Sequence, residues 1–246
     1  MGRRLGQHFL ASRPILERIA ASVCATSPET IVEIGAGRGA LTEFLLQSGA
    51  HVHAIELDPE MVAQLAHRFP AHPGLTVHHA DVLSTDLAQW GPASLAGNLP
   101  YFITSPILDR IRRARTTIRT STLLIQKEVA DRVIAKPKSR DYGFLTVVTQ
   151  SWADTEHIVH VPPEAFRPPP KVDSSVVLLT GKPDIPTDLD AFLKFASHAF
   201  RQKRKNLRNN LSGIYPMADW EHMAERTLRA EQLSIEELRA LWRKLS

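Results

Sequence analysis

The stretch Glu29-Thr30-Ile31-Val32-Glu33-Ile34-Gly35-Ala36-Gly37-Arg38-Gly39 decides the fold. Its first half contains the β-branched residues that favour a strand, and alternate glycines follow it. A helical pattern of apolar residues then runs from Ala40 through Leu46 and stops at Gly49. The order of strand, glycine turn and helix is typical of the first unit of an α/β protein with a parallel sheet.

The same alternation continues along the chain. Further strands are predicted at 51–56, 75–79, 93–96 and 121–125, and helices are predicted after Pro59, after Ser105 and over 127–135. A helix is expected over 142–152, then strands over 157–161 and 172–179. Only residues 162–171 separate these last two strands, which is too short for a typical crossover helix, so we expect them to be antiparallel.

The C-terminal part has a different pattern. Residues 181–186 form a linker rich in Gly and Pro, and helical periodicity follows over 189–211 and 217–245, with a helix start at Ser234. The sequence therefore predicts an α/β domain over 1–181 and a small all-helical domain over 187–246.

Composition excludes several classes of protein. Cys24 is the only cysteine, so no intramolecular disulfide or Cys-rich zinc site is possible, and the chain fits a reducing cytosol. No apolar run reaches the length of a membrane span, and the N-terminus lacks the apolar core of a secretion signal. Histidines occur as His51-x-His53 and His78-His79, but no matching set of acids or cysteines accompanies them, and we predict no metal.

Positive charge is clustered, although the net charge is only +4. Separate clusters in one chain favour a polyanionic partner such as nucleic acid, whereas a single cluster is usually only a solvated face. The first eighteen residues carry Arg3, Arg4, Arg13 and Arg18, and the other clusters are Arg110, Arg112, Arg113, Arg115 and Arg119, and Arg201, Lys203, Arg204, Lys205 and Arg208.

Acids at the ends of successive strands point to the cofactor. The glycine turn fits either a nicotinamide or an S-adenosylmethionine cofactor, but its spacing is not G-x-G-x-x-G. Glu56 can accept both ribose hydroxyls, since an ionised carboxylate has two acceptor oxygens. Asp81 either accepts from an adenine amino group or only forms a turn. Together with Glu33, these acids suit a cationic sulfonium better than a pyrophosphate.

The loop Asn98-Leu99-Pro100-Tyr101 follows the fourth strand, where open α/β sheets bind ligands. The Asn98 oxygen and the carbonyl of Leu99 or Pro100 could accept the two hydrogens of an exocyclic adenine nitrogen and aim its lone pair at a methyl group. Tyr101 or Phe102 could stack on a base taken out of its helix. The alternative is an ordinary Asn-x-Pro turn in front of a core aromatic residue.

Motifs along the whole chain resemble one family, the ribosomal RNA adenine N6,N6-dimethyltransferases, and within it the bacterial small-subunit type. They are 6–10 (GQHFL), 33–42 (EIGAGRGALT), 56–58 (ELD), 81–83 (DVL), 97–101 (GNLPY), 126–130 (QKEVA), 142–143 (YG), 162–174 (PPEAFRPPPKVDS), 200–207 (FRQKRKNL) and 229–234 (RAEQLS).

The resemblance implies a Rossmann-like fold that binds S-adenosylmethionine, with an N-terminal segment over the cofactor and a helical RNA-binding domain. It implies that Asn98, Leu99, Pro100 and Tyr101 form the catalytic loop, with Phe166 on the other face of the adenine; without it, Phe166 would be a core residue. The implied cofactor contacts are His8, Leu10, Gly35, Gly37, Glu56, Asp81 and Asn98, and the implied RNA contacts are Arg110, Arg112 and Arg113 with the Arg201–Arg208 cluster.

The implied substrate is a pair of adjacent adenines in a hairpin loop near the 3′ end of small-subunit rRNA, within a pre-assembled subunit. Each adenine would receive two methyl groups from a cytoplasmic, monomeric enzyme. One alternative is a large-subunit rRNA methylase of the antibiotic-resistance type, which the C-terminal motifs oppose. Another is a ribosome-assembly factor that binds RNA without turnover, which the intact Asn98–Tyr101 loop opposes.

Overall fold

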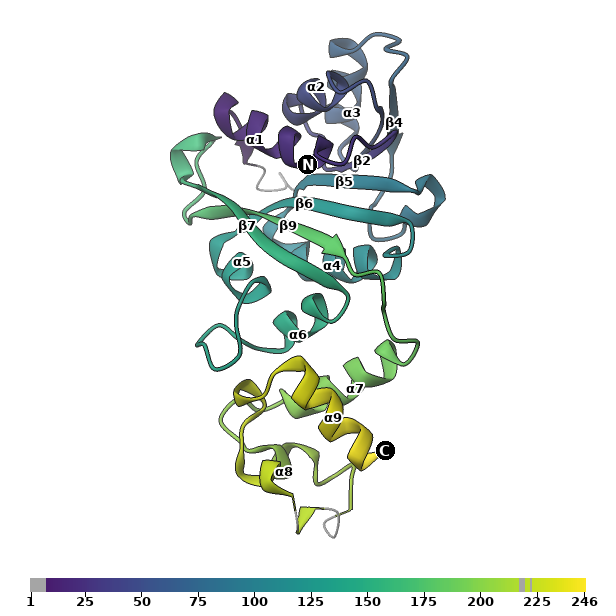
Figure 1. The fold of residues 1–246 in the computed structure, drawn as a ribbon. Helices are drawn as coiled ribbons and strands as arrows, with labels where there is room; N and C mark the ends of the chain where they lie inside the picture. Colours follow the sequence, from purple (N-terminus) through teal and green to yellow (C-terminus); the bar gives the residue numbers. More distant parts are fainter. Residues whose placement is uncertain (1–7, 217–219, 222) are drawn as a thin grey trace. The chain divides into compact units, whose positions relative to one another are not determined.

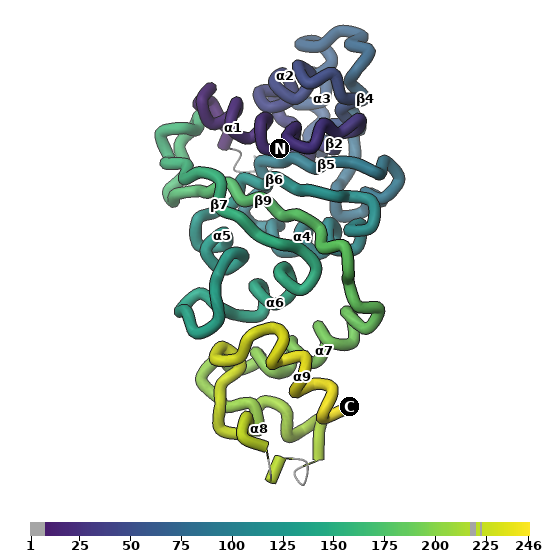
Figure 2. The backbone as a smooth tube through the Cα atoms, in the orientation of Figure 1, coloured from purple at the N-terminus to yellow at the C-terminus, as the bar shows by residue number. Residues whose placement is uncertain are grey.

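The computed structural model describes residues 8–216, 220–221 and 223–246 (Figures 1 and 2). The chain divides into two compact units, one of residues 1–130 and 154–181 and the other of residues 131–153 and 182–246. The expected linker thus follows a unit boundary at Gly181, while the segment 131–153 groups with the C-terminal residues. Arg3, Arg4, part of the 6–10 motif and part of the expected helix after Met217 lie outside the described residues.

A mixed seven-stranded sheet of order β4-β3-β2-β5-β6-β9-β7 organises the first unit. Strands β2, β3, β4, β5 and β6 pair in parallel, and β9 runs antiparallel to β6. Figure 2 shows β6 and β9 side by side although helices separate them in sequence. The strands are β2 (Thr30–Ile34), β3 (His51–Glu56), β4 (Leu75–His79), β5 (Ala93–Asn98), β6 (Ile118–Gln126), β7 (Ala153–Val161) and β9 (Ser174–Gly181).

Helices cover both faces of this sheet, as the strand–helix alternation predicts. In Figure 1, α1, α2 and α3 lie on one side of the sheet and α4 on the other. The helices of the first unit are α1 (Arg13–Cys24), α2 (Ala40–Leu46), α3 (Pro59–Arg68), α4 (Thr104–Arg113) and most of α5 (Lys127–Val133), with 3-10 turns η1 (Leu87–Trp90), η2 (Tyr101–Ile103) and η3 (Pro163–Ala165).

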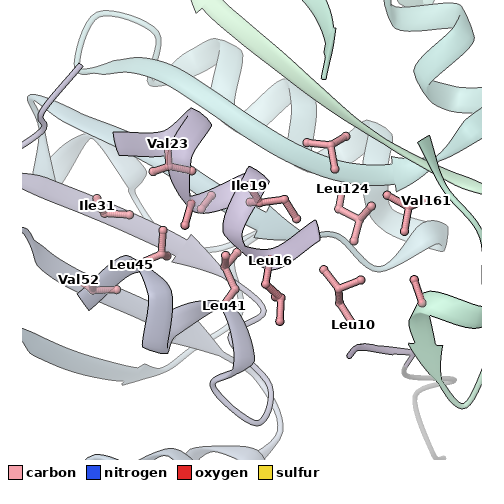
Figure 3. Close-up of a cluster of buried hydrophobic side chains, with 14 of the residues drawn as sticks. Leu10, Leu16, Ile19, Val23, Ile31, Leu41, Leu45, Val52, Leu124 and Val161 are labelled. Atoms are coloured by element: carbon pink, nitrogen blue, oxygen red, sulfur yellow. The ribbon is translucent and has the colours of Figure 1, made fainter. Parts of the chain in front are cut away.

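The core under α1 holds the N-terminal segment against the sheet. Leu16, Ile19 and Val23 recur at helical spacing and point into one apolar cluster with side chains of α2 and the central strands (Figure 3). Burying side chains of this size gives about 1.5–3 kcal/mol each. Helix α1 is absent from the elements predicted above, although Pro14 and this apolar spacing mark a helix at 13–24.

A second, two-stranded sheet joins the N-terminal segment to the segment after η3. Strand β1 (Phe9–Leu10) pairs antiparallel with β8 (Phe166–Arg167), so that Leu10 lies opposite Phe166. The sequence analysis did not anticipate this sheet. This pairing matters for the site because it places the segment that follows His8 beside the segment that contains Phe166.

The second unit is helical in its C-terminal part. It contains α6 (Phe144–Gln150), α7 (Leu189–Ala199), α8 (Leu207–Leu211), η5 (Ala224–Thr227), η6 (Ala230–Gln232) and α9 (Ile235–Leu245). The periodicity predicted over 189–211 is interrupted, because residues 200–206 form a loop. The predicted start of α9 is confirmed by a capping box in which Ser234 Oγ accepts from Glu237 N and Glu237 Oε2 accepts from Ser234 N. None of the described helices is long and apolar enough to cross a bilayer.

Candidate active site

The glycine turn closes tightly against neighbouring side chains. Gly37 and Gly39 have φ values of +54° and +79°, a region that L-residues with a Cβ rarely adopt. A Cβ at Gly37 would lie 3.2 Å from the Phe9 ring, and one at Gly39 would lie 2.6 Å from the Phe69 ring. The turn therefore needs glycine for its conformation and for the approach of these rings.

Glu56 ties the end of β3 to the glycine turn. Its Oε2 accepts from Gly37 N at 2.8 Å and its Oε1 accepts from Asp58 N at 2.9 Å, and the residue is only 6% exposed. Each carboxylate oxygen has more than one lone pair, so these bonds leave acceptor capacity for a ligand. The predicted ribose contact is thus compatible with a carboxylate that also fixes the turn.

Glu33 is a buried acid to which the sequence analysis assigned no contact. The carboxyl is 2% exposed and accepts from Thr42 Oγ1 at 2.6 Å. Burial raises its pKa to about 7; the bond from Thr42 opposes the rise and the charge of Glu56 adds to it. The sequence alone does not show that the Glu33 carboxyl is buried, and its raised pKa follows only from the structure.

Asp81 forms a turn after β4. Its Oδ1 accepts from Leu83 N at 2.8 Å, and its carbonyl accepts from the Thr85 hydroxyl at 2.8 Å. The turn-forming role is thus present. No hydrogen bond among the described residues uses Oδ2, so the contact with an adenine amino group stays a prediction.

Hydrogen bonds in the loop Asn98–Tyr101 distinguish the two candidate acceptors, the carbonyl groups of Leu99 and Pro100. The Pro100 carbonyl accepts from Ile103 N at 3.1 Å and from Thr104 Oγ1 at 3.3 Å, so it is used inside the turn that starts η2. The Leu99 N–H donates to the Leu124 carbonyl at 3.0 Å. The Leu99 carbonyl accepts no hydrogen bond within the described part of the chain, and it is therefore the better acceptor for a substrate hydrogen.

The Asn98 side chain is oriented by the N-terminal segment. Its Nδ2 donates to the His8 carbonyl at 3.1 Å. Because a carbonyl oxygen only accepts, this bond identifies the nitrogen and leaves Oδ1 as the acceptor. The His8 ring donates through Nδ1 to the Pro168 carbonyl at 2.9 Å and lies 6.2 Å from the Tyr101 ring, at 23° to it. His8 thus forms hydrogen bonds within the chain through both its backbone carbonyl and its ring.

Tyr101 is held by a hydrogen bond between hydroxyls. Its phenol oxygen lies 2.6 Å from Ser174 Oγ, and the residue is half-buried. Burial raises the pKa of the phenol, and the bond with Ser174 partly opposes this rise. Tyr101 is therefore neutral near pH 7, which suits a stacking surface and not a base.

Phe166 does not present a face to a ligand in this structure. It is 0% exposed and belongs to the apolar cluster that contains Leu10, Val161 and Leu124. This burial favours the core position that the residues predict without the resemblance, and the placing of Phe166 against the adenine stays a prediction. Phe166 supports the site indirectly, because its strand β8 pairs with β1.

The arginines of α4 are mostly engaged within the first unit. Arg112 is 7% exposed and donates to Asp109 Oδ1 through Nε at 3.0 Å and Nη2 at 2.9 Å. Arg110 donates to the Thr85 carbonyl, while the Arg113 side chain is 65% exposed. Hydrogen bonds within the chain thus engage both guanidinium groups, which speaks against an RNA surface at Arg110 and Arg112, and their contact with RNA stays a prediction.

The C-terminal basic cluster has the opposite character. Its five cationic residues are all exposed, on the loop between α7 and α8 and on α8 itself: Arg201, Lys203, Arg204, Lys205 and Arg208. Asn210 Nδ2 holds this loop by donating to the carbonyls of Ala199 at 2.8 Å and Gln202 at 3.2 Å. Residues 202–205 line an open hollow of about 580 Å³. Lys203 also donates to the Arg140 carbonyl at 2.6 Å.

Histidines on β3 and β4 form a cluster away from the catalytic loop. His53 Nδ1 and His78 Nε2 are 3.1 Å apart, and the Trp90 ring lies 5.2 Å from His53 and 4.8 Å from His78. Within the described ranges, no group of three or more His, Cys, Asp and Glu side chains could hold a metal ion.

Comparisons with known proteins identify the family of this chain. Residues 2–243 match the family described as ribosomal RNA adenine dimethylase. The chain is 39% identical over 241 residues to ribosomal RNA small subunit methyltransferase A of Chromobacterium violaceum, covering 96% of this chain and 92% of the relative.

Two solved structures are similar over nearly the whole chain. A dimethyladenosine transferase from Plasmodium falciparum has a TM-score of 0.84 and 25% identity, covering 96% of this chain and 98% of that chain. The 23S rRNA methyltransferase ErmE has a TM-score of 0.75 and 28% identity, covering 96% and 99%. With the Rossmann-like sheet and the Asn98 loop, these matches lead to one conclusion: the chain belongs to the ribosomal RNA adenine dimethylase family.

Proposed function

We propose that this protein transfers methyl groups from S-adenosylmethionine to N6 of two adjacent adenines in a hairpin loop near the 3′ end of small-subunit rRNA. Each adenine receives two methyl groups, within a pre-assembled small subunit in the cytoplasm, and the enzyme acts as a monomer. The observation that carries the proposal is the pair of acceptors at the end of β5: Asn98 Oδ1, oriented by the His8 carbonyl, and the unused Leu99 carbonyl.

The glycine turn and the acids at the ends of β3 and β4 fit a bound methyl donor. A Cβ at Gly37 would close the turn against Phe9, so only glycine leaves this backbone open to a nucleoside. Glu56 would hold the ribose and Asp81 Oδ2 the adenine, with His8, Leu10, Gly35 and Asn98 completing the site. When bound, S-adenosylmethionine supplies a methyl group on a positively charged sulfur, which is why no strong base is needed beside the acceptor.

The catalytic loop prepares the acceptor nitrogen. Asn98 Oδ1 and the Leu99 carbonyl accept its two hydrogens, which draws the lone pair out of the ring system toward the methyl group. Such preorganised acceptors need little rearrangement during the reaction. Once it carries the first methyl group, the positively charged nitrogen releases one of its hydrogens as a proton to solvent. Before the second transfer only one hydrogen remains, so one acceptor suffices, and positioning by the Tyr101 ring gains importance.

The exposed basic cluster gives the protein its grip on RNA. Arg201, Arg204, Lys205 and Arg208 would contact phosphates, which position a nucleic acid without reading its sequence. We assign this role to the helical domain over 187–246, and catalysis to the domain over 1–181. Binding through phosphates is salt-sensitive because counterions are released.

Among the relatives, the name ribosomal RNA small subunit methyltransferase A recurs at 37–41% identity, and this supports the small subunit as the target. The likeness to ErmE keeps large-subunit rRNA as the second candidate. An assembly factor without turnover is the third. It has no need of an Asn98 amide held by the His8 carbonyl.

Substitutions in the loop test the mechanism. Asn98→Ala should lose methyl transfer to small subunits by at least a hundredfold, whereas RNA affinity should stay within about twofold. Tyr101→Ala should lose methyl transfer to a similar extent, and RNA affinity should fall by no more than about tenfold, because phosphate contacts remain. Lys194→Ala, an exposed change on α7, is the control and should retain the activity. Wild-type rates for Asn98→Ala would refute the proposed acceptor role.

A further inference from the structure

Phe102 is a large aromatic side chain that the proposed mechanism does not use. It is 71% exposed, although it directly follows the half-buried Tyr101. The other exposed aromatic side chain of this size among the described residues, Phe144, is 39% exposed. An exposed apolar side chain is common on a protein surface, so its place in the catalytic loop is what gives it meaning.

The turn that carries Phe102 is fixed on both sides. Tyr101 is anchored to Ser174 by its hydroxyl, and the Pro100 carbonyl accepts from Ile103 N. Thr104, which starts α4, is 2% exposed. Residues in a 3-10 turn are about 120° apart around the axis, so anchoring Tyr101 directs the next side chain elsewhere. The exposure of Phe102 is therefore built into the loop.

Phe102 also heads the solvent face of α4. Ser105, Pro106, Asp109 and Arg113 follow it at spacings of three or four residues, which places them on one side of a helix. The charge of Asp109 is balanced on this face, because its carboxylate accepts from Arg112 Nε and from Arg113 Nε at 2.8 Å. The face thus begins with an aromatic ring beside the catalytic residues and ends with an exposed guanidinium.

The exposed Phe102 ring beside Tyr101 offers a stacking surface for the base that is left uncovered when an adenine is taken out of an RNA loop. The extruded base leaves its neighbour with an uncovered π-face, at a cost of a few kcal/mol. An aromatic side chain that stacks on such a base contributes about 1–3 kcal/mol and tolerates any base. A ring one residue from Tyr101 can reach the next nucleotide, because adjacent Cα atoms are about 3.8 Å apart.

We propose that Phe102 is a substrate-positioning residue that stacks on the base next to the target adenine. The inference rests on the proposed function, and it deepens it: in a pair of adjacent adenines, one base lies at Tyr101 while the other lies on Phe102. Exchange of the two bases between these rings then gives access to the second adenine without full release of the RNA.

The test measures transfer from labelled S-adenosylmethionine to small subunits from cells that lack the modification. Phe102→Ala should raise KM for the subunits about tenfold, with kcat and KM for S-adenosylmethionine within about twofold of wild type. Phe102→Tyr should restore KM, whereas Phe102→Leu should not, because leucine is apolar but cannot stack. Phe144→Ala serves as the matched control and should leave all constants unchanged.

A second measurement does not depend on turnover. The fluorescence of Phe102→Trp, relative to wild type, should be quenched when the protein is titrated with a hairpin RNA that carries two adjacent adenines. Wild-type KM for Phe102→Ala, full rescue by leucine, or an unquenched tryptophan would each overturn the stacking role. If wild-type enzyme labels no small-subunit RNA, the proposed function fails instead, and a quenched tryptophan would still support base stacking.

Discussion

The arginines of α4 and the cations of the α7–α8 loop look alike in composition and differ in what they contact. Arg112 is 7% exposed because it lies four residues after Leu108, on the same buried face of α4 as Ile107, Leu108 and Ile111. The loop over 200–206 has no such periodic face, so Arg204 and Lys205 are exposed. A run of positive charge therefore becomes a structural element or a binding surface according to the backbone that carries it.

The largest effect should come from removing the exposed cluster. Replacing Arg201, Arg204, Lys205 and Arg208 together by alanine should lower RNA affinity on the order of a hundredfold, and the slope of log affinity against log salt should fall by about 3. Filter binding at several salt concentrations measures both quantities. The double variant Lys194→Ala/Arg243→Ala, on α7 and α9, is the control. If the slope of log affinity against log salt did not change in the quadruple variant, the exposed cluster would not bind phosphates, and the proposed difference from the α4 arginines would be contradicted.

Arg112→Ala should instead destabilise the fold. The substitution removes two charge-assisted hydrogen bonds to Asp109 and leaves a cavity beside α4, so the free energy of unfolding should fall by about 2 kcal/mol. Urea unfolding measures this change. RNA affinity of the folded protein should stay within about twofold. A stable variant with weakened RNA binding would show that Arg112 belongs to an RNA surface after all.

The histidines on β3 and β4 are a third group of basic side chains, and they become positively charged only at acidic pH. Burial lowers the pKa of His53 to about 4, and the nearby His51 and His78 add to this; burial also lowers the pKa of His78. The unfolded chain therefore binds protons more readily between pH 6.5 and 4. The contribution of these histidines to stability should be constant above this range and fall within it. Glu33, whose pKa is raised to about 7, contributes with the opposite sign between about pH 7 and 4.5, so the histidine contribution is the difference between the wild-type protein and His53→Gln.

After allowance for solvent screening, this loss should be about 1 kcal/mol. Thermal unfolding as a function of pH measures it, and His53→Gln should flatten the profile. An unchanged profile in that variant would mean that the cluster carries no proton-linked energy.

The smallest effect is expected at Arg113. Its side chain is 65% exposed, and an exposed ion pair with Asp109 contributes little, so Arg113→Ala should change the free energy of unfolding by less than about 0.5 kcal/mol. The matched comparison is Arg112→Ala on the same carboxylate. Equal losses from both variants, measured by urea unfolding, would contradict the distinction drawn from burial.

Local signals predicted most of the fold. The limits of β3 and β4 agree with the sequence pattern residue by residue, because each strand is short, β-branched and bounded by turn residues. The pairing of β1 with β8 could not be predicted, since Leu10 and Phe166 are far apart in sequence and each strand has two residues. Helix α1, in contrast, was predictable from its apolar spacing and from Pro14 at its first turn.

The site was predictable in its residues and less so in their contacts. The Asn98 loop is marked by its sequence and by its place after a strand. The hydrogen bond from Asn98 Nδ2 to the His8 carbonyl joins residues that are 90 positions apart in sequence, so no local pattern predicts it. For the same reason the position of Phe166 opposite Leu10 emerged only from the pairing of β8 with β1.

The most direct test of the account is where the methyl label goes. Purified protein and labelled S-adenosylmethionine should be incubated separately with small subunits, large subunits and naked rRNA from cells that lack the modification. The account predicts label in small-subunit rRNA, recovered as N6,N6-dimethyladenosine at two adjacent positions. Label in large-subunit rRNA, or no label in any RNA, would contradict it.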